Sequence, residues 1–414
     1  MIMTSRQKNP FVVMGKIPAE LFCDREKESD KLIHSLINGN NVVLISPRRM
    51  GKTGLIHHCY DDERIRDEYF TFFVDILHTS NLREFTYNLS RSIYKELVPR
   101  GKRLAKSFIQ ALKSLSGSIS IDTLNGSPSF GVELGDIANA ELTLEEIFDY
   151  LDHANKPCIM AIDEFQQITH YPEKNIEALL RGHIQQMQNC NFVFAGSERS
   201  IMSQMFGSSA RPFYQSADTL ELNAIPFEVY SSFADRLFRE RRKHVADEAL
   251  RFVYDLFRGH TFYMQKVFNE AFSLTGTGQS CEKATVVEAI DRILNDKETT
   301  YMEILSALSE KQKPLLYAIA AEGTAARVTS MAFAKKHNLE SASAIQSAIK
   351  QLLNQNLITE IHKEYAVNDK FFALWINRIY NEKVFPYLCA HKKAPQCPQN
   401  QTVIPTTPTG DMPT

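Results

Sequence analysis

Long apolar runs are missing from this chain of 414 residues. No stretch approaches the ~18 consecutive apolar residues that a membrane-spanning helix needs. Residues 1–10 are polar and lack the apolar core of a signal peptide. We therefore expect a cytoplasmic protein without a membrane partner.

Paired cysteines and a large excess of one charge are also missing. The seven cysteines form no Cys-x-x-Cys pair and no Cys/His spacing typical of zinc, so we expect free thiols. The formal net charge of -2 argues against a protein that is coated with nucleic acid over its whole surface. Any basic patch must therefore be local, on a chain long enough for two or three domains.

The motif that organises the chain follows a run of strand formers at residues 42–45 and reads Ser-Pro-Arg-Arg-Met-Gly-Lys-Thr. It fits the phosphate loop Gly-x-x-x-x-Gly-Lys-[Ser/Thr], with Ser46 in the first glycine position. In such a loop, backbone N–H groups cradle phosphate oxygens, the lysine reaches the β- and γ-phosphates, and the hydroxyl holds Mg²⁺. The expected nucleotide-binding residues are Ser46, Pro47, Arg48, Arg49, Met50, Gly51, Lys52, Thr53 and Gly54.

Two consecutive carboxylates end a second apolar strand. Residues 158–162 run directly into Asp163 and Glu164. In ATP-hydrolysing phosphate-loop proteins, the first acid holds the Mg²⁺ shell and the second polarises the attacking water. We expect Thr53 and Asp163 to hold the metal, and Glu164 to act as the catalytic base beside Lys52.

Two further polar residues are candidates for contact with the γ-phosphate. Ser197 ends an apolar strand at residues 192–196, which in the additional-strand class lies between the phosphate-loop strand and the acidic strand. A helix N-cap role would fit this serine equally well. Arg211 precedes a fifth strand at residues 219–222 and could act as a finger toward a neighbouring subunit. An ordinary surface arginine is the alternative.

The remaining segments of the first part read as additions to this core. Residues 116–139 alternate like a hairpin insertion, and residues 226–300 are helical and form an expected lid, with Arg258 as a second candidate sensor. A helical pattern at residues 22–37 has Asp24 as its expected N-cap. Aromatic and apolar residues nearby could line the nucleotide base or belong to the core: Phe11, Ile17 and Phe22.

Residues 301–385 have the pattern of a winged helix-turn-helix. Three helices are followed by a two-stranded wing at residues 357–367. Residues 306–385 contain ten Lys/Arg and seven Asp/Glu, which is mildly basic for a DNA binder, so a protein partner remains an alternative. The exposed face of the third helix should carry Ser343, Gln346, Ser347, Lys350 and Gln351, preceded by Lys335, Lys336 and His337. The proline-rich tail at residues 386–414 is expected to be disordered.

Taken together, the motifs resemble those of the archaeal-type ATPases in the STAND branch of phosphate-loop proteins. The residues that carry the resemblance are 46–53, 162–166, 194–197, 211–214 and 365–375. The resemblance implies a parallel α/β ASCE core over residues 1–225, with strand order 5-1-4-3-2, followed by the lid and the winged helix. One departure is residues 259–261, Gly-His-Thr, where the wider class has Gly-x-Pro.

Relatives in this class are switches that are closed with ADP and open or assembled with ATP. The resemblance therefore implies a slow, Mg²⁺-dependent ATPase that forms a nucleotide-dependent homo-oligomer. A second hypothesis is a DNA-binding regulator in which the nucleotide is structural and the winged helix binds double-stranded DNA. A third is a scaffold whose winged helix binds protein.

Overall fold

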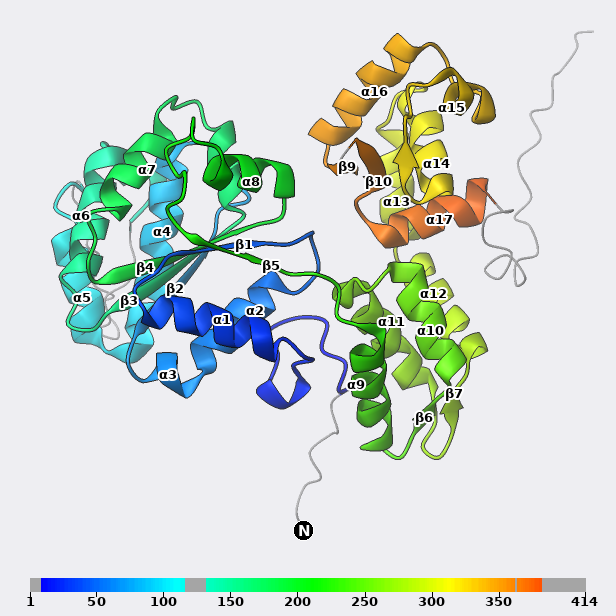
Figure 1. Cartoon of the computed structure of the whole chain (residues 1–414), viewed down its shortest axis with the longest axis horizontal. Coiled ribbons are helices and arrows are strands. Elements are labelled where there is room, and N and C mark those ends of the chain that lie inside the picture. The colour runs from blue at the N-terminus through cyan, green and yellow to red at the C-terminus, as the bar shows by residue number, and fades with distance from the viewer. Residues whose placement is uncertain (1–8, 116–131, 362, 382–414) are drawn as a thin grey trace, which may run out of the picture. The chain divides into compact units, whose positions relative to one another are not determined.

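A computed structural model describes residues 9–115, 132–361 and 363–381 (Figure 1). The chain divides into two compact units. One is Met1–Lys297 with Glu360–Glu364, and the other is Glu298–Thr359 with Tyr365–Thr414. The predicted tail at residues 386–414 and most of the predicted insertion, residues 116–131, lie outside the described residues.

A five-stranded parallel sheet forms the centre of the first unit (Figure 1). Its order is β2-β3-β4-β1-β5, which confirms the expected order 5-1-4-3-2. All six residues of β3 are buried, as expected for a parallel sheet that helices cover on both faces. The strands are β1 Val42–Ile45, β2 Phe70–Asp75, β3 Cys158–Asp163, β4 Cys190–Gly196 and β5 Asp218–Glu221.

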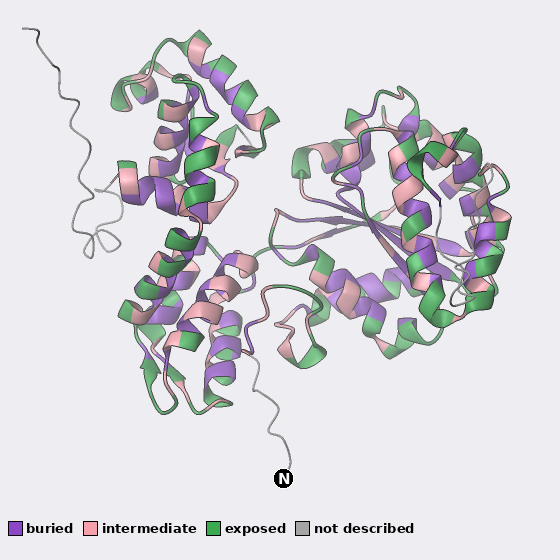
Figure 2. Cartoon of the chain, turned by 180° about the vertical axis from the view of Figure 1, so that it is seen from behind, coloured by how far each residue is buried: buried purple, intermediate pink, exposed green. Residues whose placement is uncertain are grey.

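Alternate side chains of the strands pack against two separate layers of helices. Val43 and Ile162 belong to a core shared with α4 to α8, whereas Val42 and Ala161 belong to one shared with α1 to α3. Figure 2 shows the strands as buried between these layers. The helices are α1 Glu26–Ile37, α2 Lys52–Asp61, α3 Glu63–Arg66, α4 Leu82–Leu97, α5 Lys102–Ala111, α6 Ala140–Asp152, α7 Ile176–Ile184 and α8 Arg199–Gly207.

One local prediction was wrong in this unit, and a second is tested only in part. Arg25, not Asp24, is the N-cap residue of α1, and both have positive φ. The guanidinium of Arg25 instead donates to the carbonyl of Asn223, 2.6 Å away. In the described part of the predicted hairpin, residues 132–139 contain the 3₁₀ helix Leu134–Asp136 and no strand.

A helical bundle follows β5 within the same unit. A parallel pair of short strands joins its loops, and aromatic packing fills its centre: Phe11 lies 5.4 Å from Phe238 and 5.6 Å from Phe268, between ring centroids. Phe11 is therefore a core residue of this bundle. The elements are α9 Phe227–Arg239, β6 His244–Val245, α10 Asp247–Phe257, α11 Thr261–Leu274, β7 Ser280–Cys281 and α12 Lys283–Asp296.

The second unit is a winged helix, as predicted. Trp375 is fully buried at its centre, with Tyr301 and Phe372 against its ring. Ser341 caps α16 by accepting a hydrogen bond from the Ala344 amide. The elements are α13 Glu298–Ser306, α14 Gln312–Glu322, β8 Ala325–Ala326, α15 Met331–Lys336, α16 Ala342–Asn354, β9 Ile358–Ile361, β10 Glu364–Val367 and α17 Lys370–Tyr380.

The third helix of the winged fold, α16, has the two faces expected of it. Ile345, Ile349 and Leu352 are buried. The five polar residues predicted for the outer face are all exposed: Ser343, Gln346, Ser347, Lys350 and Gln351. Among the residues that the structure describes, no helix is both long and apolar enough to cross a membrane.

Candidate nucleotide site

The loop between β1 and α2 has the backbone conformation of a tight phosphate-binding turn. Ser46 continues the strand, because its amide donates to the carbonyl of Gly196 in β4, at 3.2 Å. Its φ is not positive, so this position needs no glycine. Gly51, with φ 97°, is the N-cap of α2 and takes a left-handed conformation that suits glycine. Arg49 also has a positive φ, of 67°.

The predicted metal ligands meet at the carboxyl edge of the sheet. The hydroxyl of Thr53, in the first turn of α2, donates to a carboxylate oxygen of Asp163 at 2.7 Å. Asp163 is the last residue of β3 and is 5% exposed. Lys52, at the start of α2, is also buried and lies 3.6 Å from the carboxylate of Glu164. The two motifs therefore form one cluster, although 110 residues separate Thr53 from Asp163.

Three polar side chains hold the Glu164 carboxylate. The hydroxyl of Ser197 and the amide of Gln166 each donate to the same oxygen, Oε2, at 2.5 Å, and Lys52 faces the other oxygen. The Gln166 amide also lies 3.5 Å from the Ser197 hydroxyl. Glu164 itself has a left-handed backbone, with φ 57°, between β3 and the 3₁₀ helix Phe165–His170. The motif pattern indicated Glu164 and Ser197, but not the part played by Gln166.

The pKa values of the two acids are shifted in opposite directions. Burial raises the pKa of the Asp163 carboxyl above its ordinary value, although Lys52 and the Thr53 hydroxyl oppose this effect. Burial acts in the same direction on Glu164. There, the nearby Lys52 ammonium and the hydrogen bonds from Ser197 and Gln166 outweigh it, so the pKa is lowered. The ionised form is therefore disfavoured at Asp163 and favoured at Glu164, each relative to its ordinary carboxyl.

The structure separates the two alternatives for Ser197. Helix α8 begins at Arg199, and its N-cap residue is Glu198. Ser197 therefore does not fill the N-cap position, and its hydroxyl donates to Glu164. Arg48 of the phosphate loop donates to the same hydroxyl at 3.4 Å. The neighbouring Arg199 is exposed and pairs with Glu221 instead.

The guanidinium of Arg211 pairs with Glu177 of α7 in the same chain. A role toward a neighbouring subunit stays a prediction. Arg258 is exposed at the C-cap of α10.

Of the residues expected near the base, Ile17 and Phe22 border the phosphate-loop helix, because a Cβ at Gly54 would lie 3.6 Å from each.

The helical bundle contacts the phosphate loop through Arg49. The Arg49 carbonyl accepts hydrogen bonds from the Thr261 hydroxyl and the Phe262 amide, both at 3.2 Å. Its guanidinium donates to the Tyr263 hydroxyl at 2.8 Å and lies 4.7 Å from the centroid of the Phe262 ring. The departure at residues 259–261 therefore places Thr261 against the loop. Sequence patterns did not indicate this contact.

Comparison with known families identifies the first unit. A model of an ATPase domain predominantly from Archaea matches residues 22–267. The chain belongs to this family. A second model, for a probable winged helix domain, matches residues 299–378 of this archaeal-type ATPase.

Several solved structures share the fold of this archaeal-type ATPase. A Walker-type ATPase of Pyrococcus abyssi has a TM-score of 0.60 at 18% identity, over 89% of this chain and 99% of that one. The ORC2 protein of Aeropyrum pernix, in ADPNP and ADP complexes, has a TM-score of 0.53 at 14% identity, over 91% and 98%. The ORC1 protein of the same organism, in complex with DNA, has a TM-score of 0.51 at 12% identity, over 89% and 96%.

A curated relative matches in sequence. An uncharacterized ATP-binding protein of Methanocaldococcus jannaschii is 29% identical over 158 residues, which are 36% of this chain. The match spans 43% of the relative, less than half of its length.

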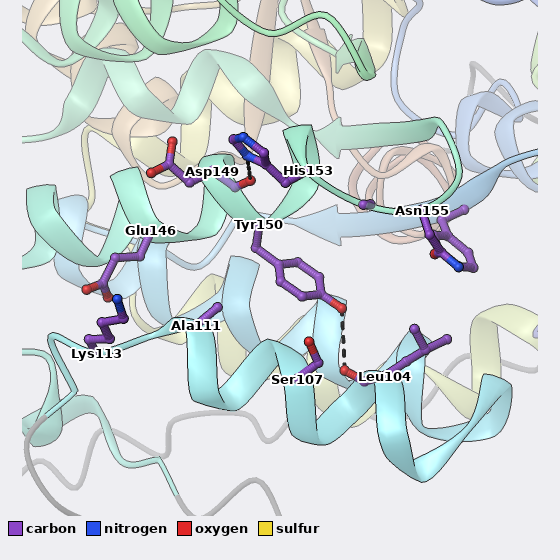
Figure 3. Close-up of a pocket in the computed structure, with 11 residues that line it drawn as sticks. Leu104, Ser107, Ala111, Lys113, Glu146, Asp149, Tyr150, His153 and Asn155 are labelled. Atoms are coloured by element: carbon purple, nitrogen blue, oxygen red, sulfur yellow. Dashed lines mark hydrogen bonds between the residues drawn. The ribbon is translucent and has the colours of Figure 1, made fainter.

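A separate pocket of about 550 Å³ lies in the ATPase domain, between α5 and α6 (Figure 3). Phe70 and Asn155 border it, next to the amino ends of β2 and β3. The Tyr150 side chain reaches across it toward the carbonyl of Leu104. Because the phosphate loop follows the carboxyl end of β1, this pocket is at the opposite edge of the sheet. It contains none of the predicted site residues.

Proposed function

We propose that this chain binds ATP with Mg²⁺, hydrolyses it slowly, and uses the nucleotide to switch conformation. The observation that carries the proposal is the cluster of Lys52, Thr53, Asp163 and Glu164 around one end of a phosphate-binding turn. Lys52 would bind the β- and γ-phosphates. Glu164 would accept a proton from the attacking water while Ser197 contacts the γ-phosphate.

The donor set fits Mg²⁺. This ion prefers oxygen ligands and keeps several waters, so one carboxylate and one hydroxyl suffice when phosphate oxygens complete the shell. Thr53 and Asp163 offer that pair, 2.7 Å apart. The described residues contain no group of three or more His, Cys, Asp or Glu side chains that could hold a metal by themselves. The ion would neutralise charge on the transferred phosphoryl group.

The switch rests on the contact between Arg49 and the lid. A nucleotide that occupies the phosphate loop changes the environment of Arg49, and the same residue contacts Thr261, Phe262 and Tyr263 by its carbonyl and guanidinium. Phosphate binding and lid position are thus coupled through one residue. We retain the division into a core at residues 1–225, a lid at 226–300 and a winged helix at 301–385 as part of this proposal.

Two measurements test the proposal together. Nucleotide released from the purified protein should be ADP or ATP, and the mass of the native particle should differ between ADP and a non-hydrolysable ATP analogue. Arg211→Ala should reduce the ATP-dependent assembly if this arginine serves a neighbouring subunit. An unchanged mass in both nucleotides would exclude assembly as the output, and absence of nucleotide binding would exclude the whole proposal.

A second candidate function is a DNA-binding regulator in which the nucleotide is structural and the winged helix binds double-stranded DNA. The exposed face of α16 favours it, since Lys, Gln and Ser side chains there can contact phosphates or base edges. The Aeropyrum pernix ORC1 protein, a similar fold, was solved in complex with DNA. A protein-binding scaffold is the third candidate, and it differs by predicting no affinity for duplex DNA.

A further inference from the structure

Gln166 is a buried glutamine whose surroundings are unusual for a packing residue. Its side chain is 1% exposed, and it follows the predicted base by two positions. Its Nε2 donates to Glu164 at 2.5 Å and lies 3.5 Å from the Ser197 hydroxyl. One amide therefore contacts both the predicted base and the predicted γ-phosphate sensor.

The orientation of this amide follows from the chemistry of its neighbour. An ionised carboxylate only accepts hydrogen bonds, so the group that faces Glu164 must be the NH₂ of Gln166. The other end, Oε1, then has no hydrogen-bond partner among the described residues. An unpaired buried acceptor is unfavourable. A residue present only for packing would be better replaced by methionine or leucine, which bury no polar atom.

The backbone of β4 leaves space for this arrangement. A Cβ on Gly196 would lie 2.7 Å from Oε1 of Gln166 and 2.5 Å from Met202 side-chain atoms. A glycine at the end of β4 therefore lets the amide lie against the strand. Phe165, the preceding residue, is fully buried among Phe194 and Phe213 and anchors the segment.

We propose that Gln166 is a positioning residue, whose amide holds the Glu164 carboxylate and the Ser197 hydroxyl in one fixed arrangement for ATP hydrolysis. This inference rests on the proposed function. Gln166 touches neither nucleotide nor water in this role and acts through Glu164. Its loss should therefore affect the chemical step and leave nucleotide binding intact.

The test compares Gln166→Met with Gln167→Met. Both remove an amide of the same size, but Gln167 donates to the carbonyl of Thr79 at 2.9 Å, away from the cluster. We expect Gln166→Met to lower kcat roughly tenfold to hundredfold, as for a misplaced catalytic group. Its KM and analogue affinity should stay within about twofold of the wild type.

Further variants separate positioning from a general structural defect. In a Glu164→Gln background, adding Gln166→Met should lower the residual turnover no further, because no base remains to be positioned. If Gln166→Met does not fold, Gln166→Asn takes its place in the test. It keeps an amide on a side chain that is one methylene shorter, and it should also lower kcat. A folded variant with wild-type kcat, or an equal loss of kcat and affinity, would overturn the inference. Wild-type turnover no higher than that of Lys52→Ala would instead overturn the proposed function.

Discussion

The ammonium of Lys52 lies 3.6 Å from the carboxylate of Glu164, and both side chains are largely buried. The ion pair joins the phosphate loop to the acidic strand. In this arrangement, Lys52 neutralises the predicted base. A bound triphosphate would compete for the same ammonium, and Glu164 would then be free to accept a proton. The charge on Lys52 is therefore central to binding and to the state of Glu164.

Lys52→Ala should abolish nucleotide binding. Truncating one partner of a buried charge pair costs roughly 2–5 kcal/mol, so the affinity for ATP should fall by at least about thirtyfold. Calorimetric titration with ATP and Mg²⁺ measures this. Lys106→Ala, at an exposed position on α5, is the matched control and should bind like the wild type. Unchanged affinity in Lys52→Ala would place the nucleotide elsewhere.

As the pH is lowered, nucleotide binding should begin to weaken at a higher pH than it would if Asp163 had the ordinary pKa of an aspartate. Ionised Asp163 is the form that can hold Mg²⁺, and burial raises its pKa above the ordinary value of 3.8. As the pH falls through this raised pKa, Asp163 gains a proton and the metal-dependent affinity is lost. The pKa of Glu164 shifts in the opposite direction, to below its ordinary value. Titrations of Mg²⁺ and ADP at a series of pH values should show the loss in the wild type and none in Asp163→Asn, whose binding should be weak throughout.

The contact between Arg49 and the lid should respond to the nucleotide. Tyr263→Phe keeps the aromatic ring but removes the hydroxyl that accepts from Arg49. We expect hydrogen exchange of the Phe262 amide, which donates to the Arg49 carbonyl, to differ between ADP and an ATP analogue. The difference should shrink in Tyr263→Phe. Tyr254→Phe, which removes a bond to the Ile225 carbonyl elsewhere in the lid, is the control. Equal exchange in both nucleotides would argue against coupling through Arg49.

If DNA is the partner of the winged helix, the affinity for duplex DNA should fall as the salt concentration rises. Each phosphate contact lowers the slope of log K against log salt by about 0.9. A triple alanine variant of Lys335, Lys336 and Lys350 should flatten that slope. Lys336 also pairs with Glu322, so its contribution should be the smallest of the three. Lys311→Ala is the control. Fluorescence anisotropy that detects no binding at low salt would leave the protein scaffold as the alternative.

The sequence predicted most of the core because its signals are local. Strand β1 occupies Val42–Ile45, the run of strand formers before the phosphate loop, and the apolar run of β3 indicates a strand before its neighbours in the sheet are known. The phosphate-loop motif and the acidic pair each have a known geometry. Their positions at the carboxyl ends of parallel strands bring Lys52 and Glu164 together once the strand order is known.

The remaining features depend on contacts between segments that are far apart in the sequence. Asp24 is a good N-cap by type, but Arg25 fills the N-cap position of α1, and its guanidinium bonds to the carbonyl of Asn223, 198 positions away. The interaction of Arg49 with Tyr263 joins residues 214 positions apart. No periodicity or motif records such a pair. The role of Gln166 is similar, because a single glutamine after an acidic motif indicates nothing until its amide is seen against Glu164 and Ser197.

The role of Glu164 is tested by measuring ATP binding and ATP turnover on the same preparations of wild type and Glu164→Gln. Removing the base should leave the affinity within about twofold and lower turnover by at least about a hundredfold. Glu145→Gln, at an exposed position on α6, should behave like the wild type in both measurements. Turnover by Glu164→Gln at the wild-type rate would show that this carboxylate is not the catalytic base of an ATP-hydrolysing switch.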